Sequence, residues 1–368
     1  MERALARIDL AAVERNCARL KAELGDAELC AVVKADGYGH GAEACAGAAL
    51  AGGASRLAVA TGSEAAAIGA RFPAAALLTM GALTPEDLDA ALAAGSEVAL
   101  WRPGFGELAS ARARALGRPA RVHVKHDSGM GRLGNRDPEG VLALARACAA
   151  DPHLELAGIW THFATADEPD SDFFDAQLER FSALAVAARD ELPGVTVHAA
   201  NSAAVFRDRR AHFDMARCGV AVYGLDPFQE DPAERGLSPA LSLSSYVADV
   251  KRFAAGESAG YGRTWRAPED TWVGVLPLGY GDGVRRGLSN NAEVLIRGRR
   301  HPLVGTVSMD NVTVDLGAET DVEPGEEVVL IGAQGEETIL AEEVARRLGT
   351  INYEVTCGIS ARVPRDRP

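Results

Sequence analysis

The sequence predicts an α/β chain, in which residues 1–238 form a (β/α)8 TIM-type barrel and residues 239–368 form a mainly β domain. Short apolar runs alternate with longer helical patterns up to about residue 225. β-branched runs between glycines replace that pattern after about residue 238. Regular alternation of strands and helices is typical of a closed parallel barrel. A doubly wound open sheet is the alternative, but no GxGxxG motif follows the first strand.

Eight candidate strands provide the barrel. They are residues 30–34, 56–61, 76–80, 97–101, 121–127, 155–163, 195–202 and 212–220. Alanine-rich stretches with helical periodicity separate them, including residues 84–95 and 173–192. Thr84 and Pro85 open the first of these two stretches, and Thr is a favoured N-cap while Pro is favoured in the first turn.

The C-terminal region has the composition of a mostly antiparallel β domain. TWVGVLPLGYGDG (271–283) and GEEVVLIG (325–332) are typical of its strands. One helix is predicted at residues 340–349, with Gly349 as its C-cap. The domain boundary is placed near RGLSPAL, residues 235–241.

Composition excludes some classes of protein. A formal net charge of −14 argues against nucleic-acid binding through a general basic surface. The six cysteines form no CxxC pair and show no metal-ligand spacing, so we expect neither a metal site nor disulfides. The N-terminus resembles no signal peptide, and no uncharged apolar run is long enough to span a bilayer. These features predict a cytoplasmic protein that does not associate with membranes.

Lysine is scarce in this chain, since only four of the 38 basic residues are lysines. They are Lys21, Lys34, Lys125 and Lys251, and Lys34 and Lys125 both stand next to glycine-rich turns. Arginine can supply positive charge, but it cannot form an imine. Lys34 and Lys125 are therefore candidates for chemistry that needs an amine, although a strand-end lysine is more often simply solvated.

The C-terminal strand ends of a barrel meet at one mouth, where barrel enzymes place their active sites. The residues expected there are Lys34, Lys125, Asp127, His162, Asn201, Ser202, Arg217, Gly219 and Val220. A lysine in this position can form a Schiff base with an aldehyde cofactor, and the loops after strands seven and eight commonly hold phosphate. A lysine, a phosphate site and a strand-end arginine together indicate pyridoxal 5'-phosphate (PLP).

Several separated motifs carry a family resemblance over essentially the whole chain. They are AVVKADGYGHG, VKHDSGMGRLG, THFATAD, ANSAA, ARCGVAVYGL, GYGRTW, LGYGDG, VGTVSMDNV and INYEV. In these motifs the chain resembles the alanine racemases, which are PLP-dependent isomerases with a barrel and a β domain. The resemblance implies interconversion of L-alanine and D-alanine, the latter a peptidoglycan precursor. It also implies a head-to-tail homodimer in which the β domain of one subunit completes the barrel site of the other.

The resemblance also implies residue roles. Lys34 would hold PLP and act as one base, and Tyr261 would be the base on the opposite face. The remaining cofactor contacts would be Tyr38, His162, Asn201, Ser202, Arg217, Gly219, Val220 and Tyr353, with Arg217 at the pyridine nitrogen and His162 supporting it. The substrate-side residues would be Arg132, Tyr280, Met309 and Asp310. Lys125 matches a lysine that is often carbamylated in the family.

General chemistry supports two of these roles. Racemisation removes a proton from one face of the α carbon and returns one to the other, so two opposed bases suit it. Arginine does not give up its proton at ordinary pH, so Arg217 would leave the pyridine nitrogen neutral and weaken the electron sink. We expect this weakening to limit transamination.

The sequence leaves alternatives open. Serine or another small amino acid could be the substrate, and a non-catalytic PLP-binding barrel protein or a PLP decarboxylase would share part of the pattern. The C-terminal motifs argue against the carrier, and Arg217 argues against the decarboxylase, which we expect to use a carboxylate at the ring nitrogen. Ser308 and Asn311 stand where the family pattern leads us to expect Cys and Gln. The use made of D-alanine also stays open.

Overall fold

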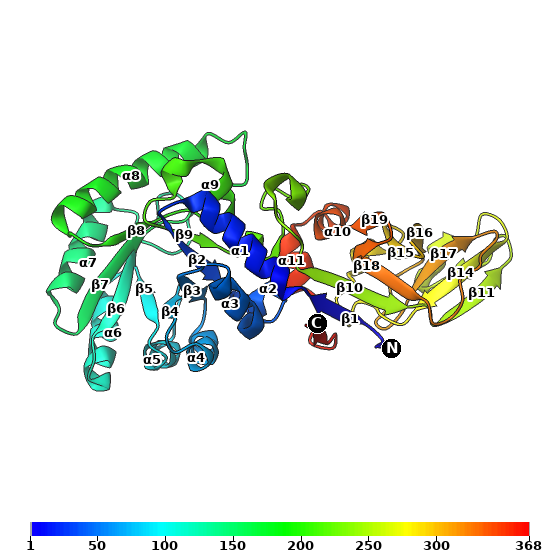
Figure 1. Cartoon of the computed structure of the whole chain (residues 1–368), viewed down its shortest axis with the longest axis horizontal. Helices are drawn as coiled ribbons and strands as arrows, with labels where there is room; N and C mark the ends of the chain where they lie inside the picture. The colour runs from blue at the N-terminus through cyan, green and yellow to red at the C-terminus, as the bar shows by residue number, and fades with distance from the viewer. Residues whose placement is uncertain (1, 368) are drawn as a thin grey trace. The chain divides into compact units, whose positions relative to one another are not determined.

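A computed structural model describes residues 2–367 of the chain. The chain divides into two compact units (Figure 1). One unit is Val13–Val222, and the other combines the residues up to Ala12 with those from Tyr223 onward. Each unit is described by itself below, as the barrel unit and the β unit.

The barrel unit contains the predicted closed parallel barrel. Within residues 2–367, eight strands close it in the order β2-β3-β4-β5-β6-β7-β8-β9. They are β2 (Glu28–Val32), β3 (Arg56–Val59), β4 (Ala76–Thr79), β5 (Glu97–Leu100), β6 (Ala120–Lys125), β7 (Leu154–Trp160), β8 (Thr196–His198) and β9 (Met215–Cys218). Pairing of Cys30 in β2 with Arg217 in β9 closes the ring. The barrel prediction is confirmed, and each strand overlaps its predicted range.

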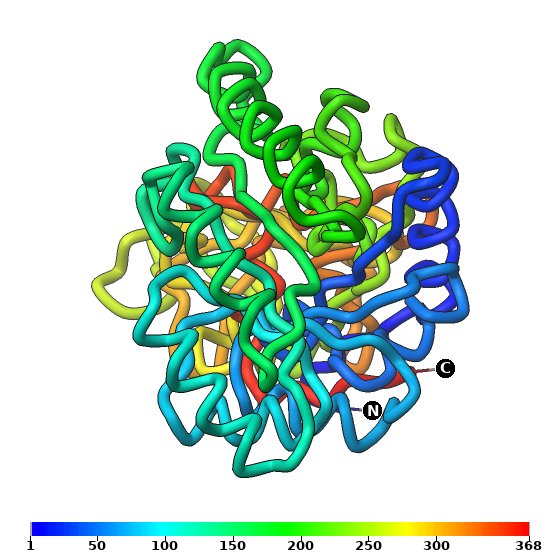
Figure 2. Tube along the Cα trace, turned by 90° about the vertical axis from the view of Figure 1, so that its left-hand side faces the viewer, coloured from blue at the N-terminus to red at the C-terminus, as the bar shows by residue number. Residues whose placement is uncertain are grey.

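One helix precedes the first barrel strand and the others lie between successive strands, and Figure 2 shows the trace passing around the barrel from blue to green. They are α1 (Leu10–Leu24), which starts in the β unit, α2 (Lys34–Tyr38), α3 (Ala42–Ala51), α4 (Gly62–Arg71), α5 (Pro85–Ala93), α6 (Pro103–Leu116), α7 (Pro138–Ala150), α8 (Phe173–Glu191) and α9 (Ser202–Arg207). The predicted start of α5 is confirmed: Thr84 Oγ1 accepts the backbone N–H of Asp87, and Pro85 is the first helical residue.

The β unit is built on a mainly antiparallel sheet. Within the described residues this sheet has ten strands, in the order β11-β14-β17-β16-β15-β18-β10-β1-β20, with β19 paired to β18. The strands are β1 (Leu5–Ile8), β10 (Leu241–Tyr246), β11 (Asp249–Phe253), β14 (Thr271–Leu276), β15 (Ala292–Ile296), β16 (Arg299–Val304), β17 (Val312–Gly317), β18 (Glu327–Gln334), β19 (Glu337–Ile339) and β20 (Arg365–Asp366). A separate pair joins β12 (Ser258–Ala259) to β13 (Trp265–Arg266).

Two helices belong to the β unit, α10 (Ala341–Leu348) and α11 (Asn352–Cys357). The predicted C-cap of α10 is confirmed, because Gly349 adopts the left-handed conformation with φ of 65°. Short 3-10 turns complete the described elements, at Arg209–Ala211, Val220–Tyr223, Pro232–Arg235, Tyr261–Arg263 and Arg286–Leu288.

The chain's start was not recognised from sequence as part of the β unit. Strand β1 pairs antiparallel with β10, with Leu5 opposite Ser244, and pairs in parallel with β20. Strand partners so distant in sequence leave no local signal. The domain boundary between residues 238 and 239 stays a prediction. In the structure, the compact β unit includes residues 223–238 as well as those that follow. The described residues contain no helix long and apolar enough to cross a membrane.

Candidate active site

Lys34 follows β2 at the C-terminal end of the barrel and is half-buried. The next four residues, 35–38, all have positive φ, between 51° and 62°. Ala35, Asp36 and Tyr38 are not glycine, and this conformation costs about 1–2 kcal/mol for each such residue. Two hydrogen bonds support the turn: Ala35 N donates to Glu64 Oε1 at 2.7 Å, and Ala42 N donates to Asp36 Oδ1 at 2.9 Å. Strain of this kind is concentrated at functional sites.

Tyr38, Ser202 and Gly219 lie together at the same end of the barrel. Ser202 Oγ accepts the backbone N–H groups of Gly219 at 3.0 Å and Ala221 at 3.4 Å. A Cβ on Gly219 would lie 2.2 Å from Tyr38 Oη, so a side chain at position 219 would displace the Tyr38 ring from where it lies. Asn201 caps α9 by accepting the N–H of Ala204 at 3.0 Å. We call Tyr38, Ser202, Gly219 and Val220 the anion cradle, because hydroxyl and backbone N–H groups gather there.

Arg217 is buried and is held entirely by neutral acceptors. Its Nη2 donates to the carbonyls of Thr161 at 2.8 Å and Ala199 at 3.0 Å, and lies 3.3 Å from His162 Nδ1. Its Nη1 donates to His198 Nδ1 at 2.8 Å. Burial lowers the pKa of Arg217 to about 10, which still leaves it charged at neutral pH. These contacts use only some of the five N–H groups of a guanidinium.

Lys125 lies inside the same end of the barrel, at the end of β6. Its Nζ is 4.3 Å from the centre of the Trp160 ring, and Arg217 also lies over that ring, at 4.6 Å. Burial, followed by the charges of Arg217 and Arg132, lowers the pKa of Lys125 to about 7. Burial and the same positive neighbours hold the pKa of His162 well below its ordinary value. Lys125 is therefore partly a neutral amine at neutral pH.

The turn after β6 is organised by Asp127. Its Oδ1 accepts the N–H groups of Gly129 at 3.2 Å and Gly131 at 2.9 Å. Arg132 follows this turn and is exposed. The charge of Lys34 also acts on Lys125, so the mouth gathers Lys34, Lys125, Arg132 and Arg217 with few carboxylates. Such an arrangement favours an anionic ligand.

The other predicted site residues lie in the β unit. Tyr280 N donates to Ser308 O at 3.0 Å, and Thr306 Oγ1 donates to Tyr261 O at 2.7 Å. Asp310 accepts from Arg362 at 2.8 Å. Tyr261, Tyr280 and Met309 are three of the six large hydrophobic side chains exposed in the described residues, with Tyr261 75% and Met309 52% exposed. Tyr353 lies in α11 and is half-buried.

Sequence reasoning missed a set of buried polar residues in the barrel interior: Glu97, His123, Trp160 and His198. Glu97 and His123 are joined by a short hydrogen bond, and Trp160 stacks on His198 with 5.6 Å between ring centres. A signal was present, because His123 and Lys125 are two residues apart on one strand and therefore face the same side. Two polar residues on that face of a barrel strand indicate a polar interior.

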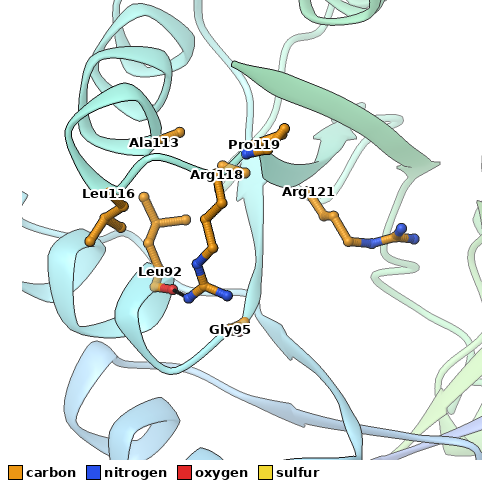
Figure 3. A pocket seen from close by; sticks show the side chains of 9 residues that line it. Leu92, Gly95, Ala113, Leu116, Arg118, Pro119 and Arg121 are labelled. Atoms are coloured by element: carbon orange, nitrogen blue, oxygen red, sulfur yellow. Dashed lines mark hydrogen bonds between the residues drawn. The ribbon is translucent and has the colours of Figure 1, made fainter. Parts of the chain in front are cut away.

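One surface pocket lies away from this mouth, beside the start of β6. It holds about 80 Å³ and is lined by Leu92, Gly95, Ser96, Ala113, Leu116, Arg118, Pro119, Ala120 and Arg121. In Figure 3 the guanidinium of Arg118 points to the Leu92 carbonyl, whereas Arg121 extends away from it. The pocket contains no lysine and is small, so it is not the candidate active site.

Comparisons with known proteins agree over both units. The model for the alanine racemase N-terminal domain matches residues 8–227, and that for the C-terminal domain matches residues 240–367. The alanine racemase of Symbiobacterium thermophilum is 45% identical over 361 residues, which cover 98% of this chain and 96% of that protein.

Solved structures give the same result. An alanine racemase from Streptomyces coelicolor has a TM-score of 0.93 and 38% identity, covering 99% of this chain and 97% of its own. The crystal structure of alanine racemase from D-cycloserine producing Streptomyces lavendulae has a TM-score of 0.95 and 36% identity, covering 100% and 97%. The fold and these relatives define an isomerase of the racemase class, acting on an amino acid. The chain belongs to the alanine racemase family.

Proposed function

We propose that this protein interconverts L-alanine and D-alanine with PLP held at the mouth of the barrel. The observation that carries the proposal is the anion cradle, in which Gly219 leaves room for Tyr38 beside the hydroxyl of Ser202. The cradle suits a phosphate, and Lys34 at the same mouth suits an aldehyde. Arg217 has N–H groups beyond those that its protein acceptors use, which suits a neutral ring nitrogen. The residues present therefore fit PLP.

The proposed chemistry divides proton transfer between two residues. When bound, PLP withdraws electrons from the substrate and makes its α proton acidic. Lys34 would hold the cofactor covalently and exchange a proton through Nζ on one face of the α carbon. Tyr261 would do the same through Oη on the other face, so neither base has to cross the substrate. Arg132 would bind the substrate carboxylate, because guanidinium matches a carboxylate in shape and charge.

The remaining site residues support these steps. Asn201 and His162 would line the cofactor, with His162 3.3 Å from Arg217. Tyr353 would add a phosphate contact. Tyr280, Met309 and Asp310 would shape the substrate side. A cytoplasmic location completes the proposal.

Exposure of the β-unit residues supports a head-to-tail homodimer with shared sites. Tyr261 is exposed, and an exposed side chain would be a poor base, because proton transfer requires the base to be held within hydrogen-bond distance of the substrate proton. In the proposed dimer, Tyr261 of one chain completes the barrel mouth of its partner.

Mixing two inactive variants tests this arrangement. In a dimer of one Lys34→Ala chain and one Tyr261→Phe chain, one shared site would carry both substitutions and the other would carry neither. Random mixing should therefore restore activity at about a quarter of the sites. Activity that stays at the level of the separate variants would exclude shared sites, and mixing Lys34→Ala with itself is the control.

Lys125 is proposed to carry a carbamate. The ammonium form would first lose one proton to give the neutral amine. The amine nitrogen would then form a bond to the carbon of carbon dioxide as one C=O π bond opens, and a second proton would leave, so the side chain would change from +1 through neutral to −1. This anion would pair with Arg132 and hold it toward the substrate. Bicarbonate should raise the activity of the wild-type chain and have no effect on Lys125→Ala.

Borohydride reduction with mass mapping tests the cofactor directly. Reduction of the purified protein with PLP should fix a pyridoxyl group on Lys34 and on no other lysine. Lys21 is the internal reference, because its Nζ donates to Gly25 O at 2.7 Å and Ala27 O at 2.8 Å at the end of α1. Labelling of Lys21 instead, or no labelling, would overturn the proposal.

Racemisation rates for alanine and serine test the substrate. We expect kcat/KM to be larger for alanine, and a larger value for serine would favour the alternative substrate. Cofactor binding without turnover of any amino acid would favour a non-catalytic PLP-binding protein.

A further inference from the structure

A chain of polar side chains crosses the barrel interior from Arg217 to the opposite end. His198 Nε2 lies 2.9 Å from His123 Nδ1, and His123 Nε2 lies 2.6 Å from Glu97 Oε2. Together with the contact of Arg217 with His198, these bonds connect the mouth with the N-terminal end of β5. We call Glu97, His123, His198 and Arg217 the relay.

The direction of every hydrogen bond in the relay is set from both ends, because Arg217 can only donate and the Glu97 carboxylate can only accept. A guanidinium only donates, so His198 Nδ1 accepts and its proton is on Nε2. His198 Nε2 then donates to His123 Nδ1, which places the proton of His123 on Nε2 as well. That proton is donated to Glu97. Both imidazoles are thus neutral, and each has its proton on the side toward Glu97.

Local structure keeps the relay in place. Gly158 in β7 is opposite His123, and a Cβ there would lie 2.2 Å from His123 Nδ1. Trp160 is opposite His198 and stacks on it with 3° between the ring planes. Both histidines are almost fully buried, and burial is the main cause that lowers the pKa of each. Adding a second proton to either ring would therefore cost free energy, because the resulting charge would be buried.

Glu97 is the fixed end of the relay. Its two oxygens accept from Arg121 Nε at 2.9 Å and from His123, and its carboxylate forms an ion pair with Arg56 at 2.5 Å. Burial opposes its charge, but His123 and Arg56 more than offset this and lower its pKa to about 2. Glu97 is therefore an acceptor at all ordinary pH values.

We infer that Glu97, at the end of the barrel away from Lys34, is a positioning residue for Arg217 that acts by fixing the tautomers of His123 and His198. An acceptor at position 97 leaves a lone pair on His198 Nδ1 for Arg217. A donor at position 97 would reverse the relay, put a proton on His198 Nδ1 and displace Arg217 from it. This inference rests on the proposed function for its effect on the reaction, but the tautomers themselves do not depend on the cofactor.

Nitrogen-15 NMR of histidine-labelled protein tests the inference in wild type, Glu97→Gln and Glu97→Asp. We expect His123 and His198 of the wild type to be protonated on Nε2 only, with and without PLP. Glu97→Gln should protonate His198 Nδ1 in a measurable fraction of molecules, and Glu97→Asp should restore the wild-type state. Protonation of His198 Nδ1 in the wild type would overturn the inference.

Holoenzyme measurements give the second readout. Glu97→Gln should lower kcat on the order of tenfold, the scale of losses one contact away from a functional group, with KM for alanine changed less than twofold. It should also shift the cofactor absorbance. Wild-type tautomers and absorbance in Glu97→Gln would overturn the inference, whereas failure of the wild type to bind PLP would overturn the proposed function alone.

Two further variants complete the design. Glu155→Gln is the matched control, because Glu155 pairs with Arg121 at the same end of the barrel but does not contact a histidine. It should leave tautomers, absorbance and kcat unchanged. If Glu97→Gln does not fold, His123→Phe breaks the relay while leaving Glu97 its two arginines. This variant leaves the buried Nε2–H of His198 without its acceptor, so His198 should be protonated on Nδ1 in a measurable fraction of molecules. A His198 that stays protonated on Nε2 alone would overturn the inference.

Discussion

The two ends of the barrel carry opposite kinds of charge arrangement. At the N-terminal end, Glu97 is surrounded by Arg56, Arg121 and His123, so the buried charge is compensated within the chain. At the C-terminal mouth, Lys125 and Arg217 are buried beside the Trp160 ring, and no carboxylate accepts from Arg217 in the described residues. Compensated charges maintain the fold, whereas uncompensated cations cost stability and are suited to binding an anion.

The clearest contrast is expected for Lys34. Lys34→Ala should lower kcat on the order of 10⁴-fold, because in the proposed function it removes both the cofactor anchor and one base. The free energy of unfolding should change little, since Lys34 is only half-buried. Racemisation assays and urea unfolding measure the two effects, and Lys21→Ala is the lysine control. If Lys34→Ala were instead strongly destabilised, Lys34 would contribute to the fold, and the expected difference between the two ends of the barrel would be wrong.

The opposite result is expected for Arg56. Arg56→Met should lower the free energy of unfolding by about 2 kcal/mol, because the buried Glu97 loses one charged partner. Once folded, the variant should keep most of its activity, since Arg121 and His123 still hold Glu97. Urea unfolding and kcat together check this. Unchanged stability with lost activity would mean that this end acts in catalysis more directly than its geometry indicates.

Arg217 sharpens the comparison at the mouth. Arg217→Glu would place a carboxylate beside the pyridine nitrogen of the proposed cofactor. A carboxylate there would favour protonation of that nitrogen. A stronger electron sink should increase transamination, so pyruvate formed per racemisation event should rise at least about tenfold. Coupled assay of pyruvate measures this. An unchanged ratio would contradict the role of Arg217 in limiting the side reaction.

The protonation state of Lys125 makes the charge at the barrel mouth depend on pH. Its pKa of about 7 lies below the ordinary value of 10.5, so the folded chain holds a mostly neutral amine above pH 7. Carbon dioxide adds only to the neutral amine, and bicarbonate should therefore stimulate activity more at pH 8 than at pH 6. The unfolded chain binds the extra proton between pH 7 and 10.5, so Lys125 should make stability rise with pH in that range. Lys125→Met should remove that contribution, and a variant with the wild-type slope would contradict the lowered pKa.

Much of this arrangement could be predicted because it leaves local signals. Apolar runs between alanine-rich helical stretches predicted the barrel, and strand ends predicted that Lys34, Ser202 and Arg217 share one mouth. The pairing of β1 with β10 could not be predicted, because it joins residues more than 230 positions apart. The relay was missed for a related reason: Glu97, His123 and His198 come from three strands, and only closure of the barrel brings them together.

The smallest effect on stability is expected for the exposed ion pair between Arg121 and Glu155 at the N-terminal end of the barrel. Arg121 is hydrogen-bonded to Glu97 and also pairs with Glu155, whose side chain is 54% exposed. Glu155→Ala should lower the free energy of unfolding by less than about 1 kcal/mol, because water competes for an exposed ion pair. Salt should reduce the difference further, and urea unfolding at low and high ionic strength measures it. A loss as large as that of Arg56→Met would mean that Glu155 shares the compensation of the buried charge, and the division between a buried network and a solvated rim would then be wrong.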